Sequence, residues 1–333
     1  MKRRILPSFS ALLAALFLIA TLADSAFAAF GSRKKEKKKG PAIVGFLPDY
    51  RTAAIDQIPF EYLTDVIYFS IAPKWNGELD LSRLNKSALR SVVGKAKRRN
   101  VDIYICVGGW NRSGTFSAMA GNSAARHRFA WDLAEFCKRN RLRGADIDWE
   151  HPKTSTDIRN YNLLLVDLSA KFREKKLKLT VSVPGRGKQL RAHTFSLLDR
   201  VHVMAYDHAG PHSTYEHAIG DLRFWMEQGA SKEQLILGVP FYGRNDRREP
   251  LAFGALIQGQ EIDPTTDSIN GFHFNNAVTL RRKTRLAVEG GFGGVMVWEL
   301  SQDAPGEKSL LKAIHETANK TPEKTKPTGA KAK

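Results

Sequence analysis

The chain has 333 residues, of which 42% are hydrophobic, and a formal net charge of +18 at pH 7. This apolar content is enough for a sizeable core and excludes a chain that is disordered throughout. The two cysteines, Cys106 and Cys137, are too few for a disulfide framework at this length, so we expect both to be reduced and buried. No CxxC or His/Cys spacing indicates zinc, and we expect neither a metal nor a cofactor.

The first residues have the order of a targeting segment. Lys2, Arg3 and Arg4 are followed by a short apolar run over 6–22 and then by Ala26-Phe27-Ala28, a small-x-small cleavage site. This order predicts a secretory signal peptide over 1–28, and hence a secreted or periplasmic protein. The alternative is an uncleaved membrane anchor, for which the run is short.

Two Lys-rich segments flank the body of the chain, at 29–41 and at 319–333. Both are poor in apolar residues, so we expect them to be disordered. Basic tails can bind nucleic acid or an anionic surface. Because neither segment interleaves aromatic residues with its charges, we expect no nucleic-acid partner and at most weak adhesion to an anionic cell envelope.

Between these segments, short β-branched runs alternate with amphipathic stretches. The expected strands are 42–48, 65–72, 101–109, 144–150, 177–185, 200–207, 235–243 and 293–300. The expected helices are 85–99, 122–140, 155–175, 212–228, 273–289 and 307–318, with weaker ones near 55–63 and 188–198. Regular alternation of this kind predicts an α/β fold with a parallel sheet.

Eight strand-helix units match a closed (β/α)8 TIM barrel in number and length. We expect one such domain over 42–318, acting as a monomer. The alternative is an open doubly wound sheet, whose Gly-rich turn after the first strand is missing, since only Gly45 lies in that region.

Polar and aromatic residues gather where the predicted strands end. These are Asp49, Tyr50, Trp110, Glu150, Tyr206, Asp207, Tyr242, Trp298 and Glu299. The beginnings of the strands show no such pattern. Because the active groups of a barrel lie at the carboxyl ends of its strands, this distribution supports the barrel.

The segment GADIDWE, residues 144–150, places Asp146, Asp148 and Glu150 at every second position. Strand side chains alternate between faces, so the acids should point into the barrel while Ile147 and Trp149 pack against the outer helices. Like-charge repulsion and burial should raise at least one pKa, as a general acid requires. The alternatives are a metal site or structural pairing with Arg and Lys.

GADIDWE resembles the fourth-strand signature of glycoside hydrolase family 18, the chitinase family, whose pattern is D-x-x-D-x-D-x-E. Four further segments resemble family motifs in the same order: CVGGW (106–110), MAYD (204–207), GVPFYGR (238–244) and GGVMVWELSQD (293–303). The resemblance covers about residues 42–318. It implies a hydrolase that acts on polymers containing β-1,4-linked N-acetylglucosamine with retention of configuration.

The resemblance also implies roles for individual residues. Glu150 would be the acid and then the base, while Asp148 would orient the acetamido group of the substrate, which is itself the nucleophile. Asp146 would share a proton with Asp148, and Tyr206 would hold the acetamido oxygen. The substrate-binding residues would be Asp207, which would hydrogen-bond the sugar, Trp298, which would form an apolar floor, and Trp110, Met204, Tyr242 and Tyr50.

Some positions depart from the family pattern. Arg143 replaces the first Asp of the signature and could pair with a neighbouring acid. Cys106 and Phe46-Leu47 replace hydrogen-bonding residues, which should remove bonds to the deep Asp146. The segment 244–271 is too short for the α+β insertion that deepens the groove of many chitinases, so we expect a shallower cleft.

Two other functions stay open at this point. An endo-β-N-acetylglucosaminidase acting on N-glycans or wall glycans would share the same acid row. A non-catalytic, lectin-like chitin-binding protein could use the same barrel, although such relatives typically lack the acid that Glu150 supplies.

Overall fold

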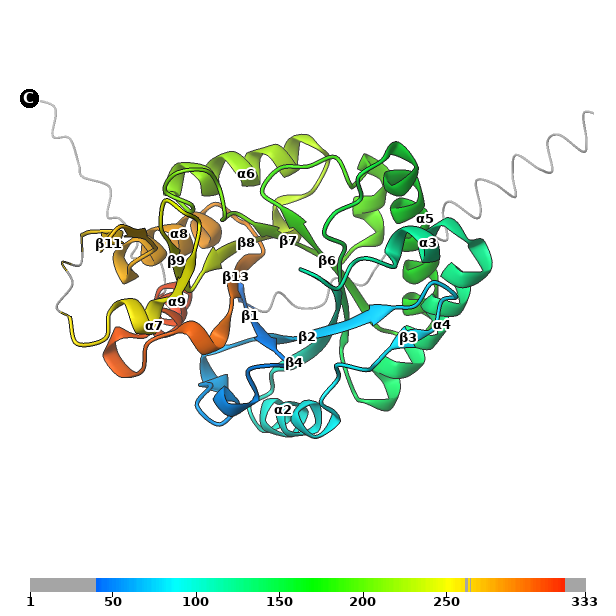
Figure 1. Ribbon diagram of the computed structural model, residues 1–333, viewed down its shortest axis with the longest axis horizontal. Helices are drawn as coiled ribbons and strands as arrows, with labels where there is room; N and C mark the ends of the chain where they lie inside the picture. Colours follow the sequence, from blue (N-terminus) through cyan, green and yellow to red (C-terminus); the bar gives the residue numbers. More distant parts are fainter. Residues whose placement is uncertain (1–39, 261–262, 264, 321–333) are drawn as a thin grey trace, which may run out of the picture. The chain divides into compact units, whose positions relative to one another are not determined.

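The computed structural model describes residues 40–260, 263 and 265–320, and within them eight parallel strands close into a barrel (Figure 1). The strands are β1 (Ala42–Pro48), β2 (Asp65–Pro73), β4 (Asp102–Gly108), β5 (Gly144–Asp148), β6 (Lys178–Pro184), β7 (Arg200–Met204), β8 (Leu235–Pro240) and β13 (Gly294–Trp298). Closure comes from the pairing of β1 with both β13 and β2. The predicted (β/α)8 TIM barrel is confirmed. The expected signal peptide over 1–28, almost all of the basic segment 29–41 and most of the tail 319–333 lie outside the described residues.

Helices surround the strands, and most begin at a residue that caps them. They are α2 (Lys86–Arg98), α3 (Phe116–Gly121), α4 (Ser123–Arg139), α5 (Ser155–Glu174), α6 (Tyr215–Glu227), α8 (Ala277–Glu289) and α9 (Leu310–Asn319). Thr154 starts α5 with a reciprocal capping box to Asp157, and Asn122 caps α4 by accepting the amide of Ala125. These side chains satisfy backbone N–H groups that the helix itself leaves unpaired.

Where the sequence predicted weak helices, the described chain forms only short 3₁₀ turns. These are η1 (Thr52–Ala54), η2 (Phe60–Tyr62) and η3 (Ala192–Leu197), and further turns are η4 (Lys232–Gln234), η5 (Leu300–Gln302) and η6 (Gly306–Lys308). No described helix is long and apolar enough to cross a membrane.

Short antiparallel elements add to the barrel mouth, and the sequence did not predict them. β3 (Leu79–Asp80) pairs with the end of β2. A second sheet has the order β10-β9-β12-β11, formed by β9 (Tyr242–Arg244), β10 (Pro250–Ala252), β11 (Ser268–Ile269) and β12 (Phe272–His273), beside α7 (Phe253–Leu256). The expected strand 235–243 is therefore two strands, because the barrel strand ends at Pro240 and Tyr242 begins the second sheet.

Two apolar layers hold the barrel. The larger fills the space between strands and helices, and the smaller fills the barrel interior with Ala42, Val44, Phe46, Ile67, Phe69, Tyr104, Cys106, Ile236 and Met296. The alternation of Val44 and Phe46 inward with Ile43 and Leu47 outward shows the period of two that a strand requires. Cys106 and Cys137 are both buried and free, as predicted.

Trp149 ties β5 to the outer helices. It is 5% exposed, stacks on Phe116 with ring centroids 5.1 Å apart, and meets the edge of Tyr161 at 5.5 Å. The prediction that Ile147 and Trp149 face away from the acids is confirmed.

We therefore expect Trp149→Ala to lower the free energy of unfolding by about 3–5 kcal/mol, through lost burial and a cavity. Urea denaturation would measure it. Trp131→Ala is the control, because Trp131 lies on the solvent side of α4 and is 49% exposed; its loss should stay below about 1 kcal/mol. Equal losses in the two variants would contradict the structural role of Trp149.

Candidate active site

A cleft of about 940 Å³ opens at the carboxyl ends of the barrel strands. Among the predicted site residues, those that line it are Tyr50, Trp110, Asp148, Glu150, Met204, Tyr206, Asp207, Tyr242 and Trp298. Asp146 lies beneath it and is fully buried. Chain segments more than 250 residues apart thus supply one cavity, as the barrel geometry requires.

The acid row occupies the end of β5. Asp148 is the last residue of the strand, and Glu150 follows it in the loop rather than in the strand as predicted. The loop after β4 supports this end: the amide of Gly109 donates to Asp148 O at 2.6 Å, and the amide of Glu150 donates to Ser113 Oγ at 3.0 Å. Gly109 has φ +87°, and a Cβ there would lie 2.2 Å from the Phe69 ring, so only glycine allows this approach.

The carboxyl groups of Asp148 and Glu150 lie close enough to influence each other's protonation, and Asp148 Oδ1 is buried without a hydrogen-bond partner. Two neighbouring buried carboxyl groups cannot both ionise cheaply, so a proton on one of them is favoured. Burial, followed by the charges of Glu150 and Asp146, raises the pKa of Asp148 well above its ordinary value. Burial also raises the pKa of Glu150 to about 7. The pair therefore holds a proton near neutral pH, at the face of the cleft.

Asp146 has a different environment from the one that the sequence suggested. It accepts hydrogen bonds from Thr180 Oγ1 at 2.5 Å and Ser182 Oγ at 2.7 Å, and its Oδ1 lies 2.8 Å from His202 Nδ1. None of these bonds joins Asp146 to Asp148, and the expected proton sharing between the two stays a prediction. Cys106 and Phe46 supply none of these bonds, as expected, and the three partners come from β6 and β7 instead.

The floor of the cleft is aromatic. The ring of Trp298 lies 5.4 Å from that of Phe46 and meets the ring of Phe69 edge-on at 5.0 Å. Phe46 thus gives apolar support to Trp298. Tyr206 is beside this floor, and burial raises the pKa of its hydroxyl well above the ordinary value, so it is a neutral donor.

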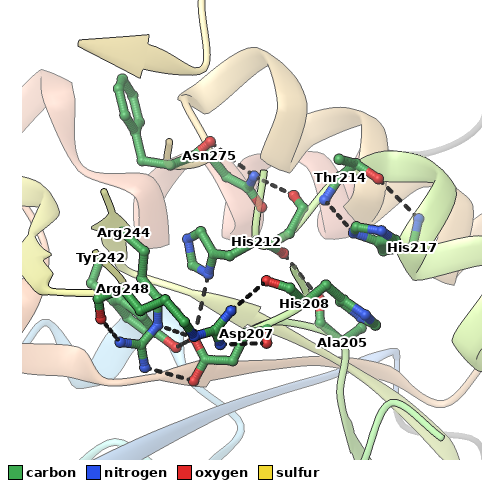
Figure 2. Close-up of polar contacts among 12 residues, drawn as sticks. Ala205, Asp207, His208, His212, Thr214, His217, Tyr242, Arg244, Arg248 and Asn275 are labelled. Carbon is green, nitrogen blue, oxygen red and sulfur yellow. Dashed lines mark hydrogen bonds and ion pairs between the residues drawn. The ribbon is translucent and has the colours of Figure 1, made fainter. Parts of the chain in front are cut away.

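Asp207 anchors one wall of the cleft (Figure 2). Its carboxylate accepts from Tyr242 Oη at 2.7 Å and from both Nε and Nη2 of Arg244, and His212 Nδ1 lies 3.5 Å away. Burial alone would raise its pKa, but the hydrogen bonds from Arg244 and Tyr242, together with the nearby imidazole of His212, lower it below the ordinary range. Asp207 therefore stays ionised, and its predicted bond to a sugar stays a prediction.

A buried amine fixes the loop that follows Asp207. Lys283 is fully buried and donates to Ser213 O, Ser213 Oγ and Asn275 Oδ1 at 2.7–2.8 Å. Burial lowers its pKa to about 7. Asn275 in turn donates to Ser213 O at 2.7 Å, as Figure 2 shows. These contacts hold the segment between β7 and α6 against α8, and with it the backbone of the Asp207 wall.

Arg143 lies at the entry of β5, away from the cleft. Its Nε is 3.7 Å from Asp102 Oδ2 on β4, which confirms the expected pairing with a neighbouring acid. At the cleft, by contrast, Tyr50 is 59% exposed and Trp110 is 70% exposed, so both present their rings to solvent. Among the described residues, no group of three or more His, Cys, Asp or Glu is arranged to hold a metal ion.

The sequence did not single out Arg112, which joins three strand ends. Its guanidinium binds Asp49 with both ends, at 2.8 Å and 2.9 Å, and also donates to Ser70 O at 2.8 Å. The side chains are only 9% and 5% exposed. A planar fork of this kind positions the loops after β1 and β4 relative to β2, which contains Ser70.

Arg112→Met should lower the free energy of unfolding by about 3–5 kcal/mol, because Asp49 is left buried without its counter-charge. The double variant Arg112→Met, Asp49→Leu should recover part of that loss, since no buried charge remains. A double-mutant cycle in urea measures both. Strictly additive losses would show that the pair does not act as a unit.

The family model described as glycosyl hydrolases family 18 matches residues 42–303. Chitinase 1 of Aphanocladium album is 24% identical over 283 residues, which cover 67% of this chain and 66% of that protein. The chain thus spans just under two thirds of the length of this relative, and 57% of the length of a probable chitinase 2 of Drosophila melanogaster is matched.

Solved structures show the same barrel. A family 18 chitinase of Flavobacterium johnsoniae is 28% identical with a TM-score of 0.76, covering 84% of this chain and 94% of that one. A chitinase-like agglutinin of Robinia pseudoacacia has the same fold at 20% identity, with a TM-score of 0.72 and coverage of 83% and 99%. Because the family model spans the barrel from its first strand to the segment beyond its last, this chain belongs to glycosyl hydrolases family 18.

Proposed function

We propose that this protein is a glycoside hydrolase that cleaves β-1,4-linked N-acetylglucosamine polymers, chitin or chitooligosaccharides, with retention of configuration. The observation that carries the proposal is the Asp148–Glu150 pair at the face of the cleft, where burial brings the pKa of Glu150 to about 7. A carboxyl group with such a pKa can release its proton to a glycosidic oxygen near neutral pH.

In the first step, Glu150 protonates the oxygen of the leaving sugar while the carbonyl oxygen of the substrate's own 2-acetamido group attacks the anomeric carbon. The glycosidic bond breaks as the new carbon–oxygen bond forms, giving a positively charged oxazolinium ring. Asp148 accepts the acetamido N–H and stabilises that charge. The neutral hydroxyl of Tyr206 donates to the acetamido oxygen and orients it for attack.

In the second step, Glu150, now ionised, takes a proton from water as the water attacks the same anomeric carbon. The oxazolinium ring opens, the acetamido group is restored, and the configuration is retained after two inversions. Asp146, with its donors from β6 and β7, keeps the base of the acid row fixed beneath both steps. Trp298 supplies the apolar surface under the reacting ring.

The alternative of another class is a lectin-like glycan-binding protein on the same barrel. Glu150, with its raised pKa and its place in the cleft, favours catalysis over binding alone. The endo-β-N-acetylglucosaminidase alternative uses the same residues, so product analysis separates it from a chitinase. We also propose export to the periplasm or the medium, on the basis of the sequence pattern over 1–28. Cell fractionation, with detection of the protein in each fraction, would test this.

Glu150→Gln should reduce the release of sugar from chitooligosaccharides by at least about 100-fold, because the general acid is removed while the shape of the side chain is kept. Binding of the same oligomers should change little, as calorimetry would measure. A variant that retains hydrolysis excludes Glu150 as the acid. If the wild-type protein binds chitooligosaccharides but releases no sugar from them, the lectin-like alternative is supported.

The pH dependence of kcat/KM follows from the protonated state that Glu150 needs. Since its pKa in the free protein is about 7, kcat/KM should fall as the pH rises above about 7, approaching tenfold per pH unit. Initial rates on a soluble chitin derivative would give this profile. A profile that stays level up to pH values well above 7 would contradict the assignment.

A further inference from the structure

The charges that line the cleft do not balance. Four arginines face it, Arg83, Arg112, Arg244 and Arg248, against the carboxyl groups of Asp148, Glu150 and Asp207. Arg112 is neutralised by Asp49 and Arg244 by Asp207. The proton held between Asp148 and Glu150 removes a further negative charge. One negative charge stays on the acid pair, and against it stand the two positive charges of Arg83 and Arg248, neither of which forms an ion pair with a described residue.

Arg248 is held in place by neutral groups. Its two terminal nitrogens donate to His208 O at 3.1 Å and Asp207 O at 2.8 Å, and its own carbonyl accepts from Arg244 (Figure 2). The nearest acid along the turn, Glu249, is engaged by Arg247 and Asn245 instead. Carbonyl contacts orient a guanidinium without cancelling its charge, so Arg248 presents a full positive charge to the cleft.

Arg83 provides the second charge, on another flank. It is exposed in the loop after β3, and it lines both the cleft and an adjoining hollow of about 180 Å³. In Figure 1, β3 and β9 lie on opposite sides of the barrel mouth. Arg83 follows β3 in the chain, Arg248 follows β9, and both line the cleft. Asp80 also lines that hollow, where hydrogen bonds from Ser82 and the nearby charges of Lys74 and Arg83 lower its pKa.

We propose that the preferred substrate is an N-acetylglucosamine-containing polymer that carries carboxylate groups, and that Arg83 and Arg248 bind those carboxylates along the cleft. The proposal rests on the proposed function and specifies its substrate class. A guanidinium matches a carboxylate with two parallel hydrogen bonds, whereas the hydroxyls and acetamido groups of neutral chitin offer no such partner. A deacetylated, cationic polymer would be repelled by the same two charges.

The test uses two soluble polymers with the same backbone, carboxymethyl chitin, which is anionic, and glycol chitin, which is neutral. Their affinities are measured for the full-length Glu150→Gln protein, so that hydrolysis does not interfere. We expect tighter binding of carboxymethyl chitin at low salt, and a smaller preference at high salt. Arg83→Gln and Arg248→Gln should each reduce the preference by about 2- to 5-fold, as expected for a partly exposed ion pair.

Matched variants separate the cleft from the rest of this basic chain. Arg247→Gln removes a charge from the same turn outside the cleft, and it should leave the preference unchanged within about 2-fold. Arg248→Lys keeps the charge and should retain most of it. The lysines of the terminal segments are present in every variant, so a preference that survives Arg83→Gln with Arg248→Gln comes from elsewhere and overturns the proposal. So does equal or undetectable binding of the two polymers.

The outcomes for the two proposals differ. A wild-type protein that hydrolyses glycol chitin but shows no arginine-dependent preference retains the proposed function and loses this inference. A protein that hydrolyses neither polymer, yet in which the arginine substitutions lower the preference, retains the anionic binding site and loses the hydrolase.

Discussion

The site depends on how the protein accommodates three carboxyl groups at the end of one strand and in the loop that follows it. An isolated charge inside a barrel is costly, so each group needs a partner. Asp146 receives hydroxyl and imidazole partners from the next two strands, while Asp148 and Glu150 hold a proton between them. The proton on Asp148 and Glu150 lowers the cost of burying their carboxyl groups. The same proton is available to a substrate in the cleft, so it serves both the stability of this strand end and its chemistry.

The barrel makes that solution possible because alternate residues of β5 face different layers. Trp149 and Ile147 anchor the strand in the outer apolar layer, so the acids between them cannot turn away. Phe46, Phe69 and Met296 fill the interior beneath Trp298, which limits the water that can reach the base of the cleft. Removing water strengthens every electrostatic interaction in the site, including the repulsion that keeps the pair protonated.

The sequence predicted the parts of the fold whose signal is local. Each barrel strand is a run of five or more residues with clear alternation or burial, and the predicted strands start within one residue of those observed. The strands β9 to β12 have two or three residues each, too few for a period to be recognised. Most of the candidate site followed from strand ends, because the barrel itself brings them together.

The sequence did not predict which side chains in the site would pair with one another. Thr180, Ser182 and His202 are polar residues at inward positions of two other strands, and that alternation was the only signal that could have linked them to Asp146. Asp148 stands between Asp146 and Glu150 in the sequence, and the pattern alone could not show that burial and the charges of both neighbours raise its pKa. Arg112 and Asp49 are 63 residues apart, with no motif to connect them.

The two unpaired arginines also act on the acid pair. A positive charge in the cleft favours the ionised form of Glu150, whereas a bound carboxylate would cancel that effect and favour the protonated form. An acidic polymer would thus help to keep on Glu150 the proton that its own cleavage consumes. Neutral chitin would leave both arginines uncompensated, and the ionised form correspondingly more stable. Recognition and acid catalysis are in this way coupled by the net charge of the cleft, without any contact between Arg248 and the acid row.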